Sequence, residues 1–270
     1  MLLLDFEFRN ISLSDFGYMR CDFNNTTGIT ISQNAKLVIN NISTPRNNRY
    51  RKTSTNYEAP LSLTMQICKN NCNGGSEEIS LLETSQLIRW LTSKRYEKII
   101  VKDKDLNNRL YFYGIFTAVR EVLSNGKTIG FELQIETNLP YLLNNEVITL
   151  NSTTTKNIHN ISCLSDEYGD IYPTMFKITM LQNGDFSIKN NLDENRTMYI
   201  SDCSNGEIIT INCDDKTIET TFDNHNIAND FNYKFFRFIN EYLNSTNILT
   251  VSIPCDIYIE YPVARKVDIQ

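Results

Sequence analysis

Apolar and polar residues alternate along most of this chain, and this period-two pattern is typical of β-strands that bury one face. At the start of the chain, Leu4, Phe6 and Phe8 fall on one face and charged residues fall on the other. Residues 60–68 repeat the pattern, with Leu61, Leu63, Met65 and Ile67 expected to point inward. The alternation therefore predicts a mainly β protein.

Asn-Gly pairs separate several of the alternating stretches, at 125–126, 183–184 and 205–206. This dipeptide suits two-residue hairpin turns because both residues tolerate positive φ. We therefore expect antiparallel hairpins over 174–190 and 197–213. Many short strands with closely spaced turns favour a sandwich of two sheets in the second half of the chain.

One stretch departs from the alternation and predicts a helix over about 80–93. Ser80 and Glu83 have the spacing of a capping box, in which each side chain satisfies a free backbone amide at the helix start. The residues expected on the buried face follow helical spacing and are Leu81, Thr84, Leu87, Ile88 and Leu91. Trp90 is expected to anchor this helix in the core of a β domain.

The charge distribution and length indicate two domains. The chain has 270 residues, with 17 Lys+Arg against 14 Asp+Glu in residues 1–140 and 9 against 18 in residues 141–270. Pro140 interrupts the alternation, so we place the domain boundary there, giving domains 1–140 and 141–270. The net charge of −6 argues against sequence-independent nucleic-acid binding, which needs many cations on one surface.

Neither export nor a membrane position is expected. The apolar start of residues 1–10 is too short for a signal peptide, and no apolar run approaches the roughly 20 residues of a membrane helix. The seven cysteines are odd in number and widely spread, so we expect mostly buried thiols made in a reducing cytoplasm.

Residues 198–215 combine two cysteines and three aspartates, which raises the question of a metal site. If Asn205-Gly206 forms a two-residue hairpin loop, Cys203 and Cys213 lie on opposite faces and about 16 Å apart along the ladder. Zinc ligands must converge to roughly 2.3 Å from one ion. The predicted hairpin therefore excludes a shared metal.

No other pattern supports catalysis. His159 and His225 are the two histidines, and neither accompanies a recognisable nucleophile motif. Cys68 and Cys72 lack a second ligand pair, so we interpret them as a loop at a strand end, with a regulatory disulfide as the alternative. A phosphate-binding glycine loop is missing from the sequence. We predict no catalytic, cofactor-binding or metal-binding residue.

A basic stretch over 45–53 is the candidate contact surface. It contains Arg46, Arg49, Arg51 and Lys52 around Tyr50. One interpretation is a solvated loop between strands. The other is an ordered contact with an acidic subunit or partner, because arginine forms bidentate bonds with carboxylates. The second half of a neighbouring copy, with its excess of acidic residues, is a candidate partner.

The order of these elements resembles the distal tail protein (Dit) family of siphophage tail components. The resemblance rests on "FEFRNISLSDFGY" at the start and on "TSQLIRWLTSKRYEKIIVKDKDLNNRLYFYGIFTAV", with its helix ending in Trp-Leu. Near the end it rests on "YPTMFKITMLQNGDFSIKNN", "NGEIITINCDD" and "ILTVSIPCDIYIEYPVAR", with the late arginine Arg265. A departure is "YLNSTN", which stands where many members have a Pro-Gly-Asn turn.

The resemblance implies a structural virion protein and no enzyme. Its N-terminal domain would be tail-tube-like and close a homo-hexameric ring, and its C-terminal domain would be a galectin-like sandwich. The ring would join the tail tube protein to tail-tip, tail-associated lysin or baseplate proteins near the tape measure protein. DNA would pass through the lumen without specific binding, so the lumen should lack a net basic lining. The protein would be made in the bacterial cytoplasm and reside at the phage tail tip.

Two other classes of function remain open from the sequence. A carbohydrate-binding module for host-surface attachment would use an exposed aromatic among Tyr233, Phe235 and Phe236, although core positions are the more common fate of such residues. An enzyme would need clustered acids in a cleft, as glycoside hydrolysis requires two carboxylates.

Overall fold

The computed structural model describes residues 5–23, 36–44, 49–69, 77–102, 110–194, 196–241 and 245–266. Its described part is mainly β, as predicted, and divides into two compact units. The first comprises the described residues up to Leu143 together with Lys266, and the second is Asn144–Arg265. The strand β10 (Leu142–Ser152) carries the chain from one unit to the other.

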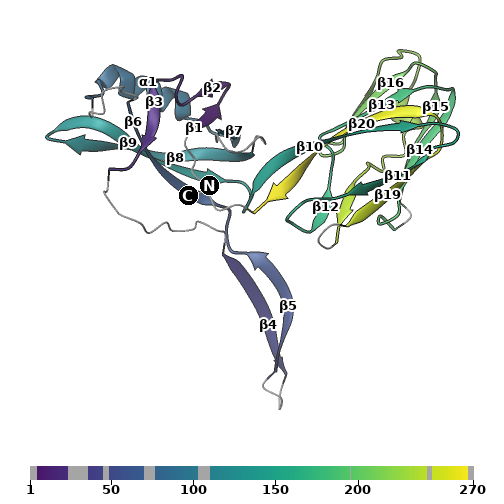
Figure 1. Ribbon diagram of the computed structural model, residues 1–270, viewed down its shortest axis with the longest axis horizontal. Helices are drawn as coiled ribbons and strands as arrows, with labels where there is room; N and C mark the ends of the chain where they lie inside the picture. Colours follow the sequence, from purple (N-terminus) through teal and green to yellow (C-terminus); the bar gives the residue numbers. More distant parts are fainter. Residues whose placement is uncertain are drawn as a thin grey trace. The chain divides into compact units, whose positions relative to one another are not determined.

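The first unit contains an antiparallel sheet, one helix and a separate two-stranded hairpin (Figure 1). One path through the sheet runs β10-β8-β7-β1-β2, and a second branch runs β8-β9-β6-β3. The strands are β1 (Asp5–Phe8), β2 (Ile11–Ser12), β3 (Tyr18–Cys21), β6 (Ser62–Lys69), β7 (Glu97–Lys102), β8 (Tyr111–Ser124) and β9 (Lys127–Thr137). Leu61, Leu63, Met65 and Ile67 are all buried, as their alternation predicted.

The predicted hairpin at Asn125-Gly126 is confirmed. Ser124 pairs with Lys127 across the turn, and the two turn residues have φ of 51° and 77°. Two positive φ values are what a type I′ turn requires, and its twist matches that of the flanking strands. This turn closes the long β8–β9 hairpin.

The predicted helix is also confirmed, as α1 (Leu81–Leu91) with a capping box between Ser80 and Glu83. Trp90 is buried, and its Nε1 donates to the Phe8 carbonyl at 3.2 Å. The predicted buried face is wrong at two positions, since Leu81 and Ile88 are 86% and 42% exposed. The helix packs through a narrower stripe of Thr84, Leu87, Trp90 and Leu91.

Gly130 in β9 leaves no room for a side chain. An added Cβ would overlap both the carbonyl oxygen of Ile67 and the Phe23 ring. Backbone on the paired strand cannot yield as a flexible side chain would, so we expect Gly130→Ala to lower unfolding stability by about 1–3 kcal/mol. Urea unfolding would measure this. Gly206→Ala is an unsuitable control because its φ is 82°, so Thr128→Ala on the same strand serves instead.

The second unit is a sandwich of two sheets, as predicted (Figure 1). One sheet has the order β17-β16-β13-β20-β10 and the other has the order β11-β19-β14-β15. The strands of the first are β13 (Met175–Met180), β16 (Ile208–Asn212), β17 (Thr217–Thr220) and β20 (Cys255–Arg265). Those of the second are β11 (Ile158–Ser162), β14 (Gly184–Asn190), β15 (Thr197–Cys203) and β19 (Thr246–Val251).

Two smaller elements complete this unit. The strands β12 (Gly169–Ile171) and β18 (Phe238–Asn240) pair with each other, and the short helix α2 (Ile227–Asp230) precedes the aromatic-rich segment. A continuous apolar core lies between the sheets and includes Phe176, Phe186 and Phe238.

The predicted hairpins at Asn183-Gly184 and Asn205-Gly206 are wrong. The strands on either side of each turn lie in different sheets, because β13 and β16 pair with each other while β14 pairs with β15. Each turn is therefore a corner that crosses the sandwich. At the second corner the Gly206 amide donates to the Met180 carbonyl and the Met180 amide donates to the Glu207 carbonyl, which ties the turn to β13.

Cys203 and Cys213 consequently do not occupy opposite faces of one ladder. Both are buried in the core between the sheets, with 2% and 0% exposure. Burial raises the pKa of each thiol to about 12, which keeps both protonated. Of the six cysteines in the described ranges, all are free thiols and four are buried.

Candidate interaction surfaces

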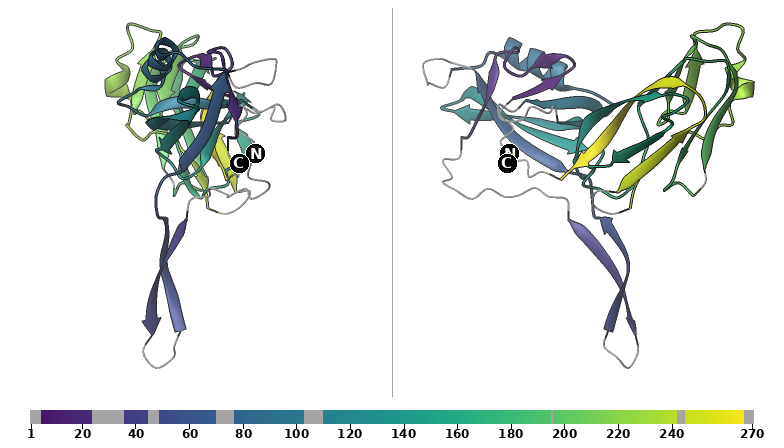
Figure 2. Two further views of the ribbon diagram at one scale, coloured as in Figure 1. Left: turned by 90° about the vertical axis from the view of Figure 1, so that its left-hand side faces the viewer. Right: turned by 45° about the vertical axis from the view of Figure 1, so that its right-hand side comes forward.

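The basic stretch singled out in the sequence belongs to a hairpin of β4 (Leu37–Thr44) and β5 (Arg49–Tyr57). These strands pair with each other and form a two-stranded sheet of their own (Figure 1, Figure 2). Arg46 lies outside the described residues, and Arg49 begins β5 opposite Thr44. The stretch from Arg49 onward is thus strand, and the prediction of a loop there is wrong.

Both faces of this hairpin carry exposed side chains. Residues paired across an antiparallel ladder share a face, so the partners Ser43 and Tyr50 lie on one face with Ile39, while Ile42 and Arg51 lie on the other. Tyr50 is 74% exposed, Ile42 is 63% exposed and Ile39 is 57% exposed. Large apolar side chains are therefore open on both faces, which the sequence pattern did not indicate.

The hairpin also carries a positive charge of its own. Arg49, Arg51 and Lys52 lie in β5, whereas neither strand contains an aspartate or glutamate. Tyr50, Arg51 and Lys52 are all exposed. This combination of exposed apolar side chains and unbalanced cations is typical of a surface that is covered by an acidic partner.

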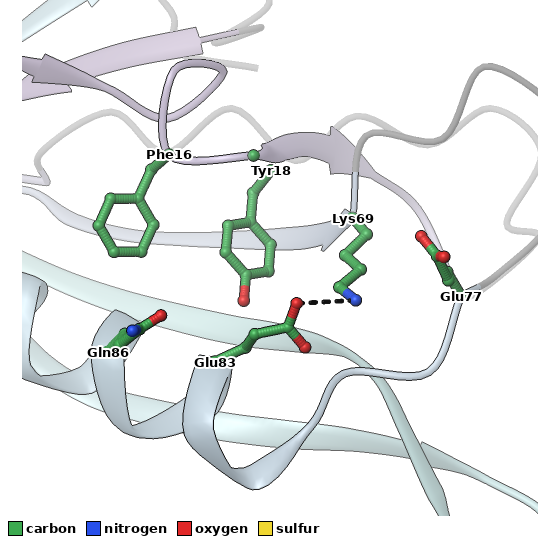
Figure 3. Close-up of a pocket in the computed structure, with 7 residues that line it drawn as sticks. Phe16, Tyr18, Lys69, Glu77, Glu83 and Gln86 are labelled. Carbon is green, nitrogen blue, oxygen red and sulfur yellow. Dashed lines mark ion pairs between the residues drawn. The ribbon is translucent and has the colours of Figure 1, made fainter.

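A small polar hollow in the first unit lies beside the start of α1, with a volume of about 270 Å³ (Figure 3). Lys69 forms an ion pair of 2.9 Å with Glu83, the residue that also closes the capping box. The hydrogen bonds from Lys69 and Ser80 lower the pKa of Glu83 to about 2. Burial and the Glu83 charge raise the pKa of Tyr18 to about 12. The contacts of Glu83 with Lys69 and Ser80 hold the start of α1 in place, so these groups have a structural role within the fold.

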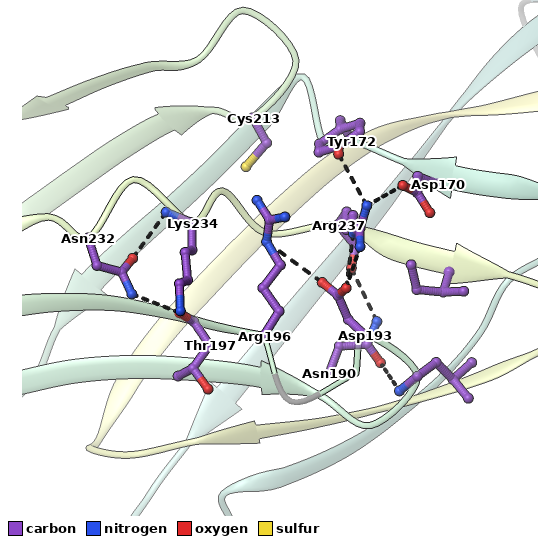
Figure 4. Close-up of polar contacts among 12 residues, drawn as sticks. Asp170, Tyr172, Asn190, Asp193, Arg196, Thr197, Cys213, Asn232, Lys234 and Arg237 are labelled. Atoms are coloured by element: carbon purple, nitrogen blue, oxygen red, sulfur yellow. Dashed lines mark hydrogen bonds and ion pairs between the residues drawn. The ribbon is translucent and has the colours of Figure 1, made fainter.

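An arginine-centred network ties together one end of the sandwich (Figure 4). The Arg237 guanidinium donates to the buried Asp193 through Nη2 at 2.7 Å and Nε at 3.0 Å. It also pairs with Asp170 and donates to the Tyr172 hydroxyl at 3.4 Å. The hydrogen bonds to Asp193 raise the pKa of Arg237 above its ordinary value. The network neutralises a buried carboxylate and joins β12 to the segment before β18.

A scan against family models gives two matches that together span most of the chain. Residues 1–139 match a phage tail protein N-terminal domain, and residues 141–261 match a phage tail C-terminal domain. The chain belongs to this family of phage tail proteins. None of the curated proteins matches.

Solved structures show the same fold for this phage tail protein. The crystal structure of the Dit protein of phage SPP1 is similar with a TM-score of 0.63 at 9% identity, over 96% of this chain and 98% of that chain. That protein is described as a paradigm of the hub adsorption apparatus in phages that infect Gram-positive bacteria. A chain of the phage P2 baseplate in its activated conformation is similar with a TM-score of 0.51 at 11% identity, over 96% and 93% of the two chains. The predicted Dit-like fold is therefore confirmed.

The aromatic side chains considered for sugar stacking in this phage tail protein divide into two groups. Phe235 and Phe236 are buried in the sandwich core, with 5% and 4% exposure, so neither can stack on a sugar. Tyr233 is 59% exposed, and its hydroxyl donates to the Ala228 carbonyl at 2.7 Å. Tyr233 is the member of the set that remains at the surface.

The two histidines make internal contacts. His159 is buried in β11 with its Nε2 2.8 Å from the Ser152 hydroxyl, and burial lowers the pKa of this histidine. His225 places its Nδ1 2.5 Å from the carboxylate of Glu207. Cys68 contacts Cys21 on the neighbouring strand. Cys72, its partner in the alternative of a regulatory disulfide, lies outside the described residues.

The described ranges offer neither a metal cluster nor a membrane-spanning helix. Within them, no group of three or more His, Cys, Asp or Glu side chains is placed to hold a metal ion. No helix of the same ranges is both long and apolar enough to cross a membrane.

Proposed function

We propose that this phage tail protein is the subunit of a homo-hexameric hub ring at the distal end of the tail. The ring joins the tail tube to the tail-tip or baseplate proteins. The proposal is carried by the likeness to the SPP1 hub protein, which extends over nearly the whole of both chains. A likeness of this extent includes both units in the same order, and family membership independently assigns the chain to a phage tail.

A closed ring needs a head-to-tail interface, in which two different surfaces of each subunit meet. We assign one of these surfaces to the β4–β5 hairpin, including Arg46, Arg49, Tyr50, Arg51 and Lys52. An isolated two-stranded hairpin is marginally stable in water, because neither face has a core to pack against. Covering Leu37, Ile39 and Ile42 would stabilise it by roughly 25 cal/mol for each Å² of apolar surface removed from water.

The second surface should be acidic, to match the charge of the hairpin. Residues 141–270 contain 18 Asp+Glu and 9 Lys+Arg, so a neighbouring copy offers a suitable surface. The tail tube protein, a tail-tip or tail-associated lysin protein and the tape measure protein complete the proposed set of contacts. The channel carries DNA without specific binding, so its wall should lack a net positive charge. Within this proposal the chain is not an enzyme, and it moves from the bacterial cytoplasm, where it is made, to the tail tip.

The assembly state of the purified chain tests the ring. Mass measurement in solution should give six copies, and electron microscopy should show a closed ring with six-fold symmetry. If the purified chain is monomeric by itself, the measurement is repeated with the tail tube protein added. A chain that stays monomeric in both conditions would contradict the proposal.

Charge reversal on the hairpin is expected to prevent assembly without unfolding the subunit. The double variant Arg51→Glu/Lys52→Glu changes two exposed residues that have no core contacts, so the thermal midpoint should stay within a few degrees of wild type. The protein concentration needed for half of the subunits to assemble should rise by at least tenfold, because like charges would then face each other across the interface. Analytical ultracentrifugation at several concentrations measures this.

A matched control is available in the same unit. Lys94 and Arg95 are also adjacent, exposed and basic, and they lie just after α1. The double variant Lys94→Glu/Arg95→Glu makes the same change in net charge and should leave assembly unaltered. Equal loss of assembly in both double variants would show that overall charge matters and would remove the hairpin from the interface.

A further inference from the structure

The outer face of the β13-β20-β10 sheet contains an open hollow of about 440 Å³, which lies entirely within the second unit. In β20 the residues Cys255, Ile257 and Ile259 point into the core, so the intervening Asp256, Tyr258 and Glu260 point outward. The alternation that builds the sandwich therefore places an aromatic ring between two carboxylates on the surface.

The neighbouring strands complete the hollow. Lys177 on β13 lies directly opposite Tyr258, and Met175 lies directly opposite Glu260. Thr149 on β10 lines the other side. Met175 is 41% exposed and lines the hollow. The hollow thus has an apolar floor with hydroxyl, ammonium and carboxylate groups around it.

Amides on β10 hold both carboxylates in fixed positions. Asn151 Nδ2 donates to Asp256 Oδ1 at 2.6 Å, and Asn145 Nδ2 donates to Glu260 Oε1 at 2.6 Å. Each bond uses one carboxylate oxygen, so the second oxygen of each group can accept a hydrogen bond from a ligand. Two oriented acceptors on either side of a ring form a preorganised site, which reduces the entropy lost on binding.

The charge of the hollow limits the class of ligand. Asp256 and Glu260 against Lys177 give a net charge of −1, which disfavours phosphates and acidic polymers. A purely apolar ligand would cover the second oxygen of each carboxylate without offering it a hydrogen-bond donor, at a high cost in free energy. The suitable ligand is uncharged, has an apolar face and carries several hydroxyl groups.

We propose that this hollow binds a neutral saccharide, with the C–H face of one pyranose ring packed on Tyr258. The carboxylates of Asp256 and Glu260 accept hydrogen bonds from ring hydroxyls, while Lys177 on the β13 side and Thr149 on the β10 side donate to other hydroxyl oxygens. A pyranose matches this set because its hydroxyls lie around the rim and its axial C–H groups form a flat apolar face. The site is distinct from the exposed Tyr233, which lies after α2.

Saturation-transfer NMR on the full chain tests this proposal. The probes are the methyl glycosides of glucose, galactose, rhamnose and N-acetylglucosamine, each titrated separately. At least one should receive magnetisation at its ring protons. Its Kd should rise by up to about tenfold in Tyr258→Ala, because loss of an aromatic packing contact costs up to roughly that factor. Tyr258→Phe keeps the ring and should bind within about threefold of wild type.

Three controls show whether binding depends on the hollow itself. Tyr233→Ala removes another exposed tyrosine and should leave the Kd unchanged. Glu260→Gln should weaken binding, and it gives a second test if Tyr258→Ala fails to fold. An oligolysine peptide tests the alternative that the hollow is an acidic protein-docking surface.

Three outcomes would overturn the proposal. In the first, none of the four glycosides binds. In the second, binding survives in both Tyr258→Ala and Glu260→Gln. In the third, the peptide binds in a way that depends on Glu260 while the glycosides do not compete with it. None of these outcomes depends on ring formation, so the saccharide site and the hub ring can fail separately.

Discussion

Replacing Glu207 by alanine is expected to destabilise the second unit by about 3–5 kcal/mol, because it breaks a buried charged network and leaves its partners unpaired. Glu207 has 0% exposure at the corner between β15 and β16. The Ser204 amide donates to its Oε2 at 2.9 Å, the Thr220 hydroxyl donates to its Oε1, and His225 Nδ1 lies 2.5 Å from the same oxygen. One carboxylate therefore fixes the corner turn, the edge strand β17 and the loop before α2.

Urea unfolding of the full chain would measure this loss. Glu219→Ala, on β17 and exposed, is the matched control and should change stability by less than about 0.5 kcal/mol. Glu207→Gln keeps an acceptor oxygen but loses the charge. Its loss of unfolding stability should therefore fall between those of Glu207→Ala and Glu219→Ala. A loss below about 1 kcal/mol in Glu207→Ala would show that the network does not support the corner.

The same residue gives an expected pH dependence. Burial alone would raise the pKa of Glu207, but the hydrogen bonds from Thr220, Ser204 and His225 outweigh it and hold the pKa below its ordinary value of 4.5. A lowered pKa in the folded state stabilises the fold above about pH 4.5, and this contribution disappears as the pH falls. The stability gap between wild type and Glu207→Gln should therefore shrink between pH 6 and pH 3.

The sequence predicted local structure well where one short stretch determines it. The capping box of α1 depends on Ser80 and Glu83, and the β8–β9 turn depends on Asn125 and Gly126. Each requires residues that are close in the sequence. The same dipeptide at 183–184 and 205–206 led to two wrong hairpins, because a turn motif does not specify which strand each arm will pair with. That choice depends on β13 pairing with β20, which is about 80 residues away.

The candidate surfaces show the same limit. The basic stretch over 45–53 was visible in the sequence, but its position on a hairpin with two open faces was not. Leu37, Ile39 and Ile42 look like ordinary strand residues, and their exposure follows from the lack of any covering layer in the described structure. The hollow around Tyr258 was missed because its members come from three strands, and the sequence did not show that β10 and β13 flank β20.

Replacing Trp90 by alanine is expected to lower the stability of the first unit by about 3–5 kcal/mol, the usual cost of removing a buried tryptophan. The indole stacks on Phe16 with ring centroids 4.5 Å apart and an interplanar angle of 11°. It also packs against Phe6 and Phe8, at centroid distances of 5.9 and 6.0 Å. Trp90 thus joins α1 to β1 and to the segment before β3, and alanine would leave a cavity where these elements meet.

Two variants divide this loss into its causes. Trp90→Phe keeps much of the packing but removes the Nε1 bond to the Phe8 carbonyl, so about 1–3 kcal/mol should be lost with the carbonyl left unsatisfied. Ile88→Ala lies on the same helix at a half-exposed position and should cost less than about 1 kcal/mol. Denaturant unfolding followed by circular dichroism ranks the three variants. Packing at Trp90 should attach α1 to the sheet. An equally small loss of stability in Trp90→Ala and Ile88→Ala would contradict this and show that the indole does not anchor the helix.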